Sequence, residues 1–349
     1  MSLPPTVTRT ARPAAALRTT VAVALGLALV AGCGGAAQRA TGRDATTAAP
    51  ASAGGMPQVT GYALAGSATP ATITRDGDLL DTIGIDGVNL TGPGTLAALD
   101  PEASRLRRAA EEAGRSTVLL MSNYSERLGD FDEPLAHRML SSPTRRAAVA
   151  AALAQRARGF DGVQIDLESL EARDTAGLVA FTRAVRRALP GRTVSMAFMA
   201  STDARGYAAR GYDLAALVPL LDVAVLMSYD QHGPWSGPGP IGALPWLRRE
   251  LAYFLTRVPA AKVDLGAAAY GYQWGGGAPQ LTVPAARRLA GSRARWIPAY
   301  AEWHATLGGG RQLWWDDARS VRTRRQVAAA QGLHGVAVWE IGGSGPLAP

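Results

Sequence analysis

Residues 159–170 read GFDGVQIDLESL, and from Val163 to Glu168 they alternate strictly between apolar and polar side chains. The apolar positions share one face and the polar positions share the other, which is the two-residue period of a β-strand with two unlike faces. The apolar face holds Val163, Ile165 and Leu167, and the polar face holds Gln164, Asp166 and Glu168. An antiparallel strand with one face in water shows the same alternation, so this pattern alone leaves the architecture open.

The residues that follow this strand decide between the architectures. A helical run at 174–189 is followed by Pro190-Gly191 and by a second apolar strand at 193–199. This β-α-β order predicts parallel strands that are covered by helices. In a closed barrel of such strands the polar face points inward, and Glu168 lies at the carboxyl end of its strand, where barrel enzymes keep their chemistry.

The same alternation of strands and helical segments extends over residues 57–349. Eight strands are expected, at 59–64, 82–90, 117–122, 162–168, 193–199, 223–230, 263–270 and 336–341. Helical runs between them include 101–113, 143–158 and 244–257, with Pro or Gly at many of their ends. We therefore predict an α/β fold with a single (β/α)8 barrel. Residues 275–317 exceed a simple crossover, and we expect a decorated loop or a small hairpin there rather than a second domain.

The first residues have the three-part plan of a secretory signal. Arginines precede an apolar run at 20–31, which is too short for a retained transmembrane span. Residues 29–33, LVAGC, look like a bacterial lipobox, in which Cys33 is lipidated and becomes the mature N-terminus. Cys33 is the only cysteine, and an unpaired thiol in an exported protein needs an explanation. The alternative is a chance cysteine after an ordinary signal peptide.

The segment between the signal and the first strand consists mainly of Ala, Gly, Thr and Ser. Such a composition buries too little apolar surface to offset the entropy of ordering, so it predicts a flexible tether. We expect a lipoprotein signal peptide at 1–32, the tether at 33–56 and one barrel domain at 57–349. The protein would then be exported and anchored to the outer face of the membrane, and we expect it to be a monomer.

The formal net charge is +8, from 36 basic and 28 acidic residues, and Lys262 is the only lysine. Part of this excess belongs to the signal segment. Pairs such as Arg186-Arg187, Arg248-Arg249 and Arg287-Arg288 are scattered over predicted helices and are expected to be solvated. Nucleic-acid binding needs basic residues clustered on one face, so we expect no nucleic-acid partner. A mildly basic surface would still favour an anionic cell wall or anionic lipids.

Glu168 and Asp166 are the strongest candidates for chemistry. Burial of a carboxyl among aromatic side chains at the mouth of a barrel raises its pKa towards the range of a general acid. Because Asp166 lies two residues away on the same face, the two carboxylates cannot both ionise cheaply, and Glu168 stays protonated. For an isolated D-x-E pattern, two acids in a salt-bridge network at a strand end would be the simpler interpretation.

The strand carries more than that pair, however. The pattern D-G-x-x-x-D-x-E, here Asp161, Gly162, Asp166 and Glu168, resembles the signature of glycoside hydrolase family 18, the chitinase-like (β/α)8 enzymes. The family often has a further Asp where this chain has Gln164, and the branch that acts on spore cortex and cell wall tends to have an amide there. Segments at 131–137, 233–246 and 314–320 also look like that branch. The resemblance implies hydrolysis of N-acetylglucosamine bonds in a polysaccharide.

By this resemblance the substrate assists its own cleavage. The 2-acetamido oxygen of the sugar attacks the anomeric carbon while Glu168 protonates the leaving oxygen. Asp166 orients the acetamido group and stabilises the oxazolinium-like intermediate, which water then opens with net retention. The mechanism needs no metal or other cofactor.

Two further segments resemble family motifs. Residues 226–232 read LMSYDQH and match an M-x-Y-D pattern, which implies that Tyr229 binds the acetamido oxygen and that Asp230 binds the sugar. Trp339, at the end of the last strand, matches the tryptophan that forms the floor of the site, although a buried structural Trp is the alternative. His232 is as readily a loop residue as a substrate contact, and Asn123 is a weaker candidate still.

Four aromatic residues could line further sugar subsites, and for each of them packing in the core is an equal alternative. They are Tyr62 on the first strand, and Tyr270, Tyr272 and Trp274 after the seventh. The candidate catalytic residues are Glu168, Asp166 and Tyr229. The candidate substrate-binding residues are Asp161, Gln164, Met227, Asp230, Trp339, Tyr62 and Tyr270. Peptidoglycan is the expected substrate and chitin the runner-up. The alternative function is a catalytically weak or inactive, lectin-like sugar-binding lipoprotein on the same fold.

Overall fold

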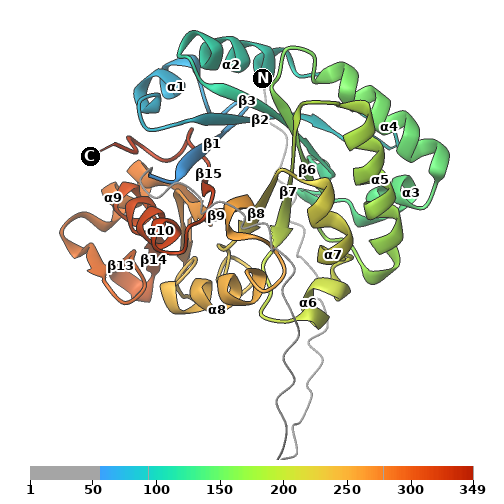
Figure 1. The fold of residues 1–349 in the computed structure, drawn as a ribbon. Helices are drawn as coiled ribbons and strands as arrows, with labels where there is room; N and C mark the ends of the chain where they lie inside the picture. The colour runs from blue at the N-terminus through green and yellow to red at the C-terminus, as the bar shows by residue number, and fades with distance from the viewer. Residues whose placement is uncertain (1–55, 93, 278, 349) are drawn as a thin grey trace, which may run out of the picture. The chain divides into compact units, whose positions relative to one another are not determined.

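The computed structural model describes residues 56–92, 94–277 and 279–348, which form a closed barrel of parallel strands (Figure 1). The eight strands are β1 (Gln58–Leu64), β2 (Thr82–Asn89), β3 (Ser116–Ser122), β6 (Gly162–Asp166), β7 (Thr193–Met199), β8 (Val223–Met227), β9 (Val263–Ala268) and β15 (Gly335–Trp339). They follow one another around the barrel in chain order, and β15 closes it against β1. The predicted (β/α)8 barrel is confirmed. The predicted signal peptide, Cys33 and the tether up to residue 55 lie outside the described residues.

Helices surround the barrel (Figure 1). They are α1 (Pro70–Asp76), α2 (Pro101–Glu112), α3 (Glu133–Leu140), α4 (Pro143–Arg156), α5 (Thr175–Ala188), α6 (Ala204–Ala209), α7 (Leu214–Leu217), α8 (Leu244–Phe254) and α10 (Ala318–Ala330). Several begin with a capping side chain followed by proline, as where the Asp100 carboxylate accepts from Glu102 N at 2.7 Å beside Pro101. Within the described residues, no helix has both the length and the apolar character needed to cross a membrane.

The two faces of β6 serve different environments, as the alternation predicts. Val163 and Ile165 are fully buried in the main apolar core, together with helix residues such as Phe181 of α5. The inward side chains form a smaller group within the barrel. Gln164 belongs to this interior, because its Oε1 accepts a hydrogen bond from Tyr62 across the barrel at 2.7 Å. The two-residue period of β6 therefore predicted correctly that Gln164 faces the barrel interior.

The same hydrogen-bond pattern recurs at the amino ends of three pairs of barrel strands. The carboxylates of Asp81, Asp161 and Asp222, each just before an even-numbered barrel strand, accept from the backbone N–H of Val59, Thr117 and Val194, each at 2.8 Å. The N–H of each aspartate donates back to the carbonyl of the same partner at 2.9 Å. These reciprocal bonds join the first barrel strand to the second, the third to the fourth and the fifth to the sixth.

An insertion lies between the seventh and eighth barrel strands (Figure 1). It contains β10 (Tyr270–Trp274), β11 (Gln280–Thr282), α9 (Val283–Ala290), β12 (Arg295–Ile297), β13 (Glu302–Thr306) and β14 (Gln312–Trp315). The strands form an antiparallel sheet in the order β11-β10-β14-β13-β12. Val283, Leu313 and Trp315 belong to its own small apolar core. The expectation of a loop or small hairpin at 275–317 is therefore wrong, since the insertion begins earlier and builds a five-stranded sheet.

Candidate active site

Two carboxyl groups lie at the carboxyl end of β6. Asp166 is its last residue and is 6% exposed, and Glu168, two residues beyond, is partly buried. Burial, and then the charge of Asp86, raises the pKa of Asp166 to about 7. Burial, and then the charges of Asp166 and Asp230, raises the pKa of Glu168 well above its usual value. A protonated carboxyl near neutral pH is what general acid catalysis requires.

Asn123 fixes the backbone of Glu168. This fully buried residue follows β3, the neighbour of β6 in the barrel. Its Oδ1 accepts from Glu168 N at 2.9 Å, and its Nδ2 donates to the carbonyl of Glu168 at 3.0 Å and to that of Asp132 at 3.3 Å. The sequence pattern ranked Asn123 low because a single amide after a strand is a common feature.

Asp86 is a site residue that the sequence pattern did not identify. It lies on β2 and is partly buried, and burial, followed by the charge of Asp100, raises its pKa to about 6. Gly84, two residues earlier, faces the barrel interior, because a Cβ added there would lie 2.4 Å from the ring of Tyr62. The alternation of β2 then directs Asp86 inward as well. An acidic residue at an inward position of an otherwise apolar strand was the available signal.

Gln164 and Tyr62 lie deeper in the barrel than the two acids. Besides Tyr62, the Oε1 of Gln164 also accepts from Ser195 Oγ at 3.3 Å. Gln164 and Tyr62 line a cavity of about 340 Å³ that reaches residues such as Asp264 and His334, at the amino ends of β9 and β15. Gln164 therefore forms part of the polar interior beneath Asp166.

Tyr229 and Asp230 follow β8, which is separated from β6 by β7 alone. Asp230 adopts a left-handed backbone conformation, with φ 62°, and accepts from the hydroxyls of Tyr270 at 2.6 Å and Tyr272 at 3.0 Å. Burial raises the pKa of Asp230 above its usual value, and these two hydrogen bonds offset only part of the rise. Burial, followed by nearby ionisable groups that include Tyr62 and Glu168, raises the pKa of Tyr229 well above its usual value. Tyr229, Glu168 and Asp166 are thus brought together.

Aromatic side chains from the barrel and the insertion surround this group. Trp339, at the end of β15, is partly buried, and its ring centroid lies 5.4 Å from that of Tyr62. The peptide bond between Trp339 and Glu340 is cis. One apolar cluster contains Tyr229, Tyr270, Tyr272, Trp274, Trp314 and Trp339. The tyrosines of the seventh barrel unit therefore both pack in the core and hold Asp230.

Trp235 is a second residue that the sequence pattern did not single out. It is 65% exposed, and its ring meets Tyr272 edge to face at 5.9 Å. Trp274 anchors the loop by donating from Nε1 to the carbonyls of Gly233 at 3.2 Å and Ser236 at 3.0 Å. The signal in the sequence was a tryptophan in a Gly- and Pro-rich segment directly after the Tyr-Asp motif. His232 stays within the same loop, with Nδ1 3.4 Å from Ser236 Oγ.

The structure corrects the placement of Asp161. Asp161 is exposed at the amino end of β6, whereas Glu168 lies beyond its carboxyl end. Its carboxylate accepts from Thr117 N and, at 3.3 Å, from Thr117 Oγ1. The prediction that Asp161 binds substrate is therefore wrong, because Asp161 forms one of the repeated hydrogen bonds that join neighbouring strands at the amino end of the barrel. Met227 remains at the mouth, as the partly buried last residue of β8.

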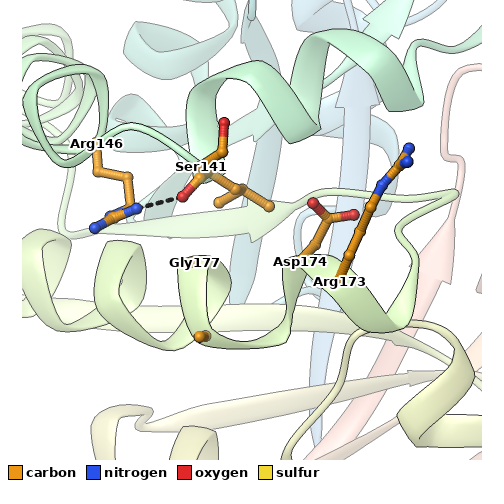
Figure 2. A pocket seen from close by; sticks show the side chains of 7 residues that line it. Ser141, Arg146, Arg173, Asp174 and Gly177 are labelled. Atoms are coloured by element: carbon orange, nitrogen blue, oxygen red, sulfur yellow. Dashed lines mark hydrogen bonds between the residues drawn. The ribbon is translucent and has the colours of Figure 1, made fainter.

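A separate group of polar residues lies outside the barrel. Glu133, His137 and Asp174 each place one possible ligand atom within 4.8 Å of the others. His137 and Asp174 already contact each other, with Nδ1 of the histidine 2.6 Å from Oδ1 of the aspartate. Glu133 forms an ion pair with Arg173 at 2.5 Å. Figure 2 shows the adjoining pocket of about 230 Å³, in which Arg173 and Asp174 lie side by side. Because a guanidinium group occupies this cluster, we assign no metal to it.

Known proteins resemble this chain in sequence and in fold. The sequence model described as "Glycosyl hydrolases family 18" matches residues 129–343. The "Uncharacterized glycosylase YvbX" of Bacillus subtilis (strain 168) is 25% identical over 316 residues, which cover 84% of this chain and 89% of that protein. The "Cortical fragment-lytic enzyme" of the same organism is 27% identical over 276 residues, which cover 72% of this chain and 62% of the relative. The chain thus spans less than two thirds of that enzyme.

Two solved structures extend the comparison. A class V chitinase from Pseudomonas fluorescens Pf-5 is similar with a TM-score of 0.74 and 26% identity, over 83% of this chain and 97% of that chain. The Bacillus cereus spore cortex-lytic enzyme SleL has a TM-score of 0.73 at 22% identity, over 83% of this chain and 72% of that chain, which shows a shared fold. The family match covers more than half of the chain, and together with the relatives it supports one conclusion: the chain belongs to glycoside hydrolase family 18 and is a glycosidase.

Proposed function

We propose that this glycosidase cleaves β-linked N-acetylglucosamine bonds in peptidoglycan by substrate-assisted retaining catalysis, with Glu168 as the acid and base. The observation that carries the proposal is the group of Glu168, Asp166 and Tyr229 at the barrel mouth, in which burial raises the pKa of both carboxyls and the charge of Asp166 raises that of Glu168 further. A neutral Glu168 can donate its proton when substrate arrives.

The reaction then takes two steps. In the first, the acetamido oxygen of the sugar bonds to its own anomeric carbon, the glycosidic C–O bond breaks, and the proton of Glu168 goes to the leaving oxygen. In the second, the Glu168 carboxylate takes a proton from water, and the water oxygen bonds to the anomeric carbon as the ring of the intermediate opens. Two inversions at one carbon give net retention. Asp166 orients the acetamido group and balances the charge of the intermediate.

The surrounding residues take supporting roles. The hydroxyl of Tyr229 binds the acetamido oxygen, and Asp230, held by Tyr270 and Tyr272, binds a sugar hydroxyl. The indole of Trp339 packs on the apolar face of the sugar. The exposed ring of Trp235 offers a second aromatic surface for a neighbouring sugar unit. Every step uses side chains of this chain and the substrate, so no metal or cofactor takes part.

Two observations favour peptidoglycan as the polymer. The relatives include cortical fragment-lytic enzymes, and Gln164 is the amide that the cell-wall branch tends to have. Chitin is the second candidate, because a class V chitinase shares the fold at 26% identity. Both polymers carry the N-acetyl group that the mechanism needs.

The location of the enzyme forms part of the proposal. A signal peptide at 1–32, lipidation of Cys33 and a tether at 33–56 would export a monomeric catalytic domain, residues 57–349, and hold it at the outer face of the membrane. The support is the sequence of this segment together with the relatives that are named as cortex-lytic enzymes.

A paired assay tests the catalytic proposal. The purified protein, Glu168→Gln and the control Glu112→Gln, an exposed residue at the end of α2, are incubated with N-acetylated peptidoglycan and with chitooligosaccharides. We expect Glu168→Gln to lose at least about 100-fold of the rate of reducing-end release, and the control to lose none. The faster polymer identifies the substrate. Sugar binding by the wild type without turnover on either polymer would contradict the proposal and leave the lectin-like function.

A further inference from the structure

The positive charge of the described residues is concentrated in the last part of the chain. Residues 56–264 contain 22 basic and 23 acidic side chains, and are therefore nearly neutral. Residues 265–348 contain nine arginines and four acidic side chains. An arginine-rich composition alone would spread the excess evenly, so this distribution is a property of the insertion and of α10.

The acidic side chains of this part are not available at the surface. Glu302, Asp316 and Asp317 are at most 1% exposed. The fourth, Glu340, is partly buried and accepts from the N–H groups of Gly342 and Gly343, each at 2.8 Å. Six arginines are exposed in the same part of the chain, namely Arg287, Arg288, Arg293, Arg295, Arg319 and Arg322. We call these six residues the arginine surface.

Contacts between their elements show that the six arginines share one region. Arg287 of α9 pairs with Asp317, the N-cap of α10, at 2.5 Å. Arg319 of α10 lies over the ring of Trp296 in β12, with its Cζ 4.1 Å from the ring centroid. These contacts join α9, β12 and the first turns of α10, and Figure 1 shows α9 and α10 close together beside the insertion sheet. The fold therefore brings the elements that carry these six arginines together.

We propose that the arginine surface binds a linear polyanion with phosphodiester groups. Guanidinium groups match phosphate through paired N–H donors, and unbalanced charge of one sign attracts a polymer of the other sign. The six groups spread over several elements rather than enclosing a pocket, which suits an extended chain better than a small anion. Leu289 is the one large apolar side chain exposed among residues 279–348, so the surface lacks the apolar patch of a protein-docking site.

The arginine surface belongs to the same part of the chain as residues of the active site, which gives polyanion binding a function. The same insertion contributes Tyr270 and Tyr272 to the active site through β10. A polyanion held on the insertion would therefore keep the enzyme next to any glycan embedded in the same anionic matrix. The proposal concerns binding alone, and it does not depend on the catalytic mechanism or on the identity of the glycan.

A matched pair of triple variants of the full chain tests the proposal. The first carries Arg288→Gln, Arg293→Gln and Arg322→Gln, which form no hydrogen bond or ion pair with the described residues. The control carries Arg108→Gln, Arg183→Gln and Arg187→Gln, which are also exposed but lie on α2 and α5. Both variants lose the same net charge. The probe is a soluble poly(glycerol phosphate), with its Kd measured at low and at physiological salt.

We expect the first variant to bind the polymer roughly tenfold more weakly and the control to bind as the wild type does. Wild-type binding should weaken as salt rises, while turnover of a short soluble substrate stays the same in all three proteins. Equal losses in both variants would overturn the proposal, since net charge would then be sufficient. It would also be overturned if the wild type ignored the polymer, or if only anionic phospholipid vesicles distinguished the two variants.

Discussion

The side-chain amide of Asn123 forms two hydrogen bonds with the peptide groups of Glu168, one to N at 2.9 Å and one to O at 3.0 Å. The donor and acceptor of one amide are thus both used on a single residue that follows a neighbouring barrel strand. Glu168 lies beyond the last hydrogen-bonded residue of β6, so the barrel ladder does not fix its backbone. Asn123 acts as a positioning residue in place of that ladder.

Asn123→Ala should therefore lower kcat by roughly tenfold or more while KM changes little, because the carboxyl is no longer held where the leaving oxygen is protonated. Some stability is lost as well, about 1–3 kcal/mol, since three backbone groups, two of Glu168 and one of Asp132, each lose a hydrogen bond. Kinetics in the Glu168→Gln background separate the two effects. There Asn123→Ala should lower the residual rate no further. A further drop of the same size would show that Asn123 acts independently of Glu168.

Asp161→Ala should behave as a structural substitution. It removes the acceptor for Thr117 N, and we expect the free energy of unfolding to fall by about 1 kcal/mol. Asp81→Ala and Asp222→Ala remove the equivalent bonds at other strands and should cost similar amounts. The kcat/KM of the folded protein should not change in any of the three. Loss of activity by Asp161→Ala alone, with its unfolding midpoint intact, would return Asp161 to the active site.

The carboxyl pair predicts a pH dependence of activity. In the proposed mechanism Glu168 acts as an acid, so kcat/KM should fall as the pH rises through its pKa, which lies well above the usual value. The charge of Asp166 contributes to that pKa, so Asp166→Asn should move this fall to lower pH, besides lowering the maximal rate. The measurement is a pH profile of kcat/KM for both proteins. A profile that is unmoved in Asp166→Asn would mean that the two groups do not interact.

The same pair predicts a pH dependence of stability. The folded-state pKa of Asp166 is about 7, above its usual value of 3.8, so the ionised carboxylate destabilises the fold. Stability present below pH 4 is lost as the pH rises towards 7. Asp166→Asn removes this loss and should raise the Tm above that of the wild type by a few degrees at pH 8. The difference should vanish near pH 4, and calorimetry at the two pH values measures it.

Arg324 joins the insertion to the loop after β8. It is fully buried, forms an ion pair with Asp316 at 2.7 Å and donates a hydrogen bond to the carbonyl of Gly242 at 2.8 Å. Burial raises the pKa of Asp316 and of Glu302, and Arg324 opposes this rise. Arg324→Met leaves both carboxyls buried without their cation and should cost about 3–5 kcal/mol. The cost should be larger at pH 8 than at pH 5, where the carboxyls take up protons.

Urea unfolding at the two pH values measures this cost. Arg325→Met, the next residue, is the control, because Arg325 is only partly buried and donates to the carbonyl of Pro57 at 3.0 Å. It should cost far less and show no comparable dependence on pH. Equal effects of the two substitutions would mean that the buried charges do not control the stability of the insertion.

Trp235→Ala should raise KM for polymeric or long oligosaccharide substrates by roughly tenfold, since a sugar stacked on its indole loses that contact. Shorter substrates that do not reach Trp235 should show little change, and kcat should remain close to that of the wild type. The side chain is 65% exposed, so the Tm should also be unchanged. Steady-state kinetics over a series of chain lengths provides the measurement. A uniform KM increase at every length would place Trp235 next to the reacting sugar instead.

Much of the barrel was predictable because strand and helix patterns are local. The predicted strand at 193–199 matches β7 at both ends, and the helix expected at 101–113 is α2 at Pro101–Glu112. The insertion was not predictable in the same way. Its short strands, such as β11 and β12, have three residues each, which leaves too little periodicity to detect. The pairing of β10 with β14 joins residues far apart in the chain.

The sequence by itself determined the acidic strand, its inward face and the family, because a two-residue period and a fixed motif are properties of adjacent residues. Barrel closure decided the rest. Asp161 and Asp166 belong to one motif, yet the strand carries them to opposite ends of the barrel, and only Asp166 is buried. Contacts such as that of Asn123 with Glu168 join segments far apart in the chain, so they exist only once the strands pair in register. The raised pKa values arise in the same way, since desolvation depends on what packs around each carboxyl.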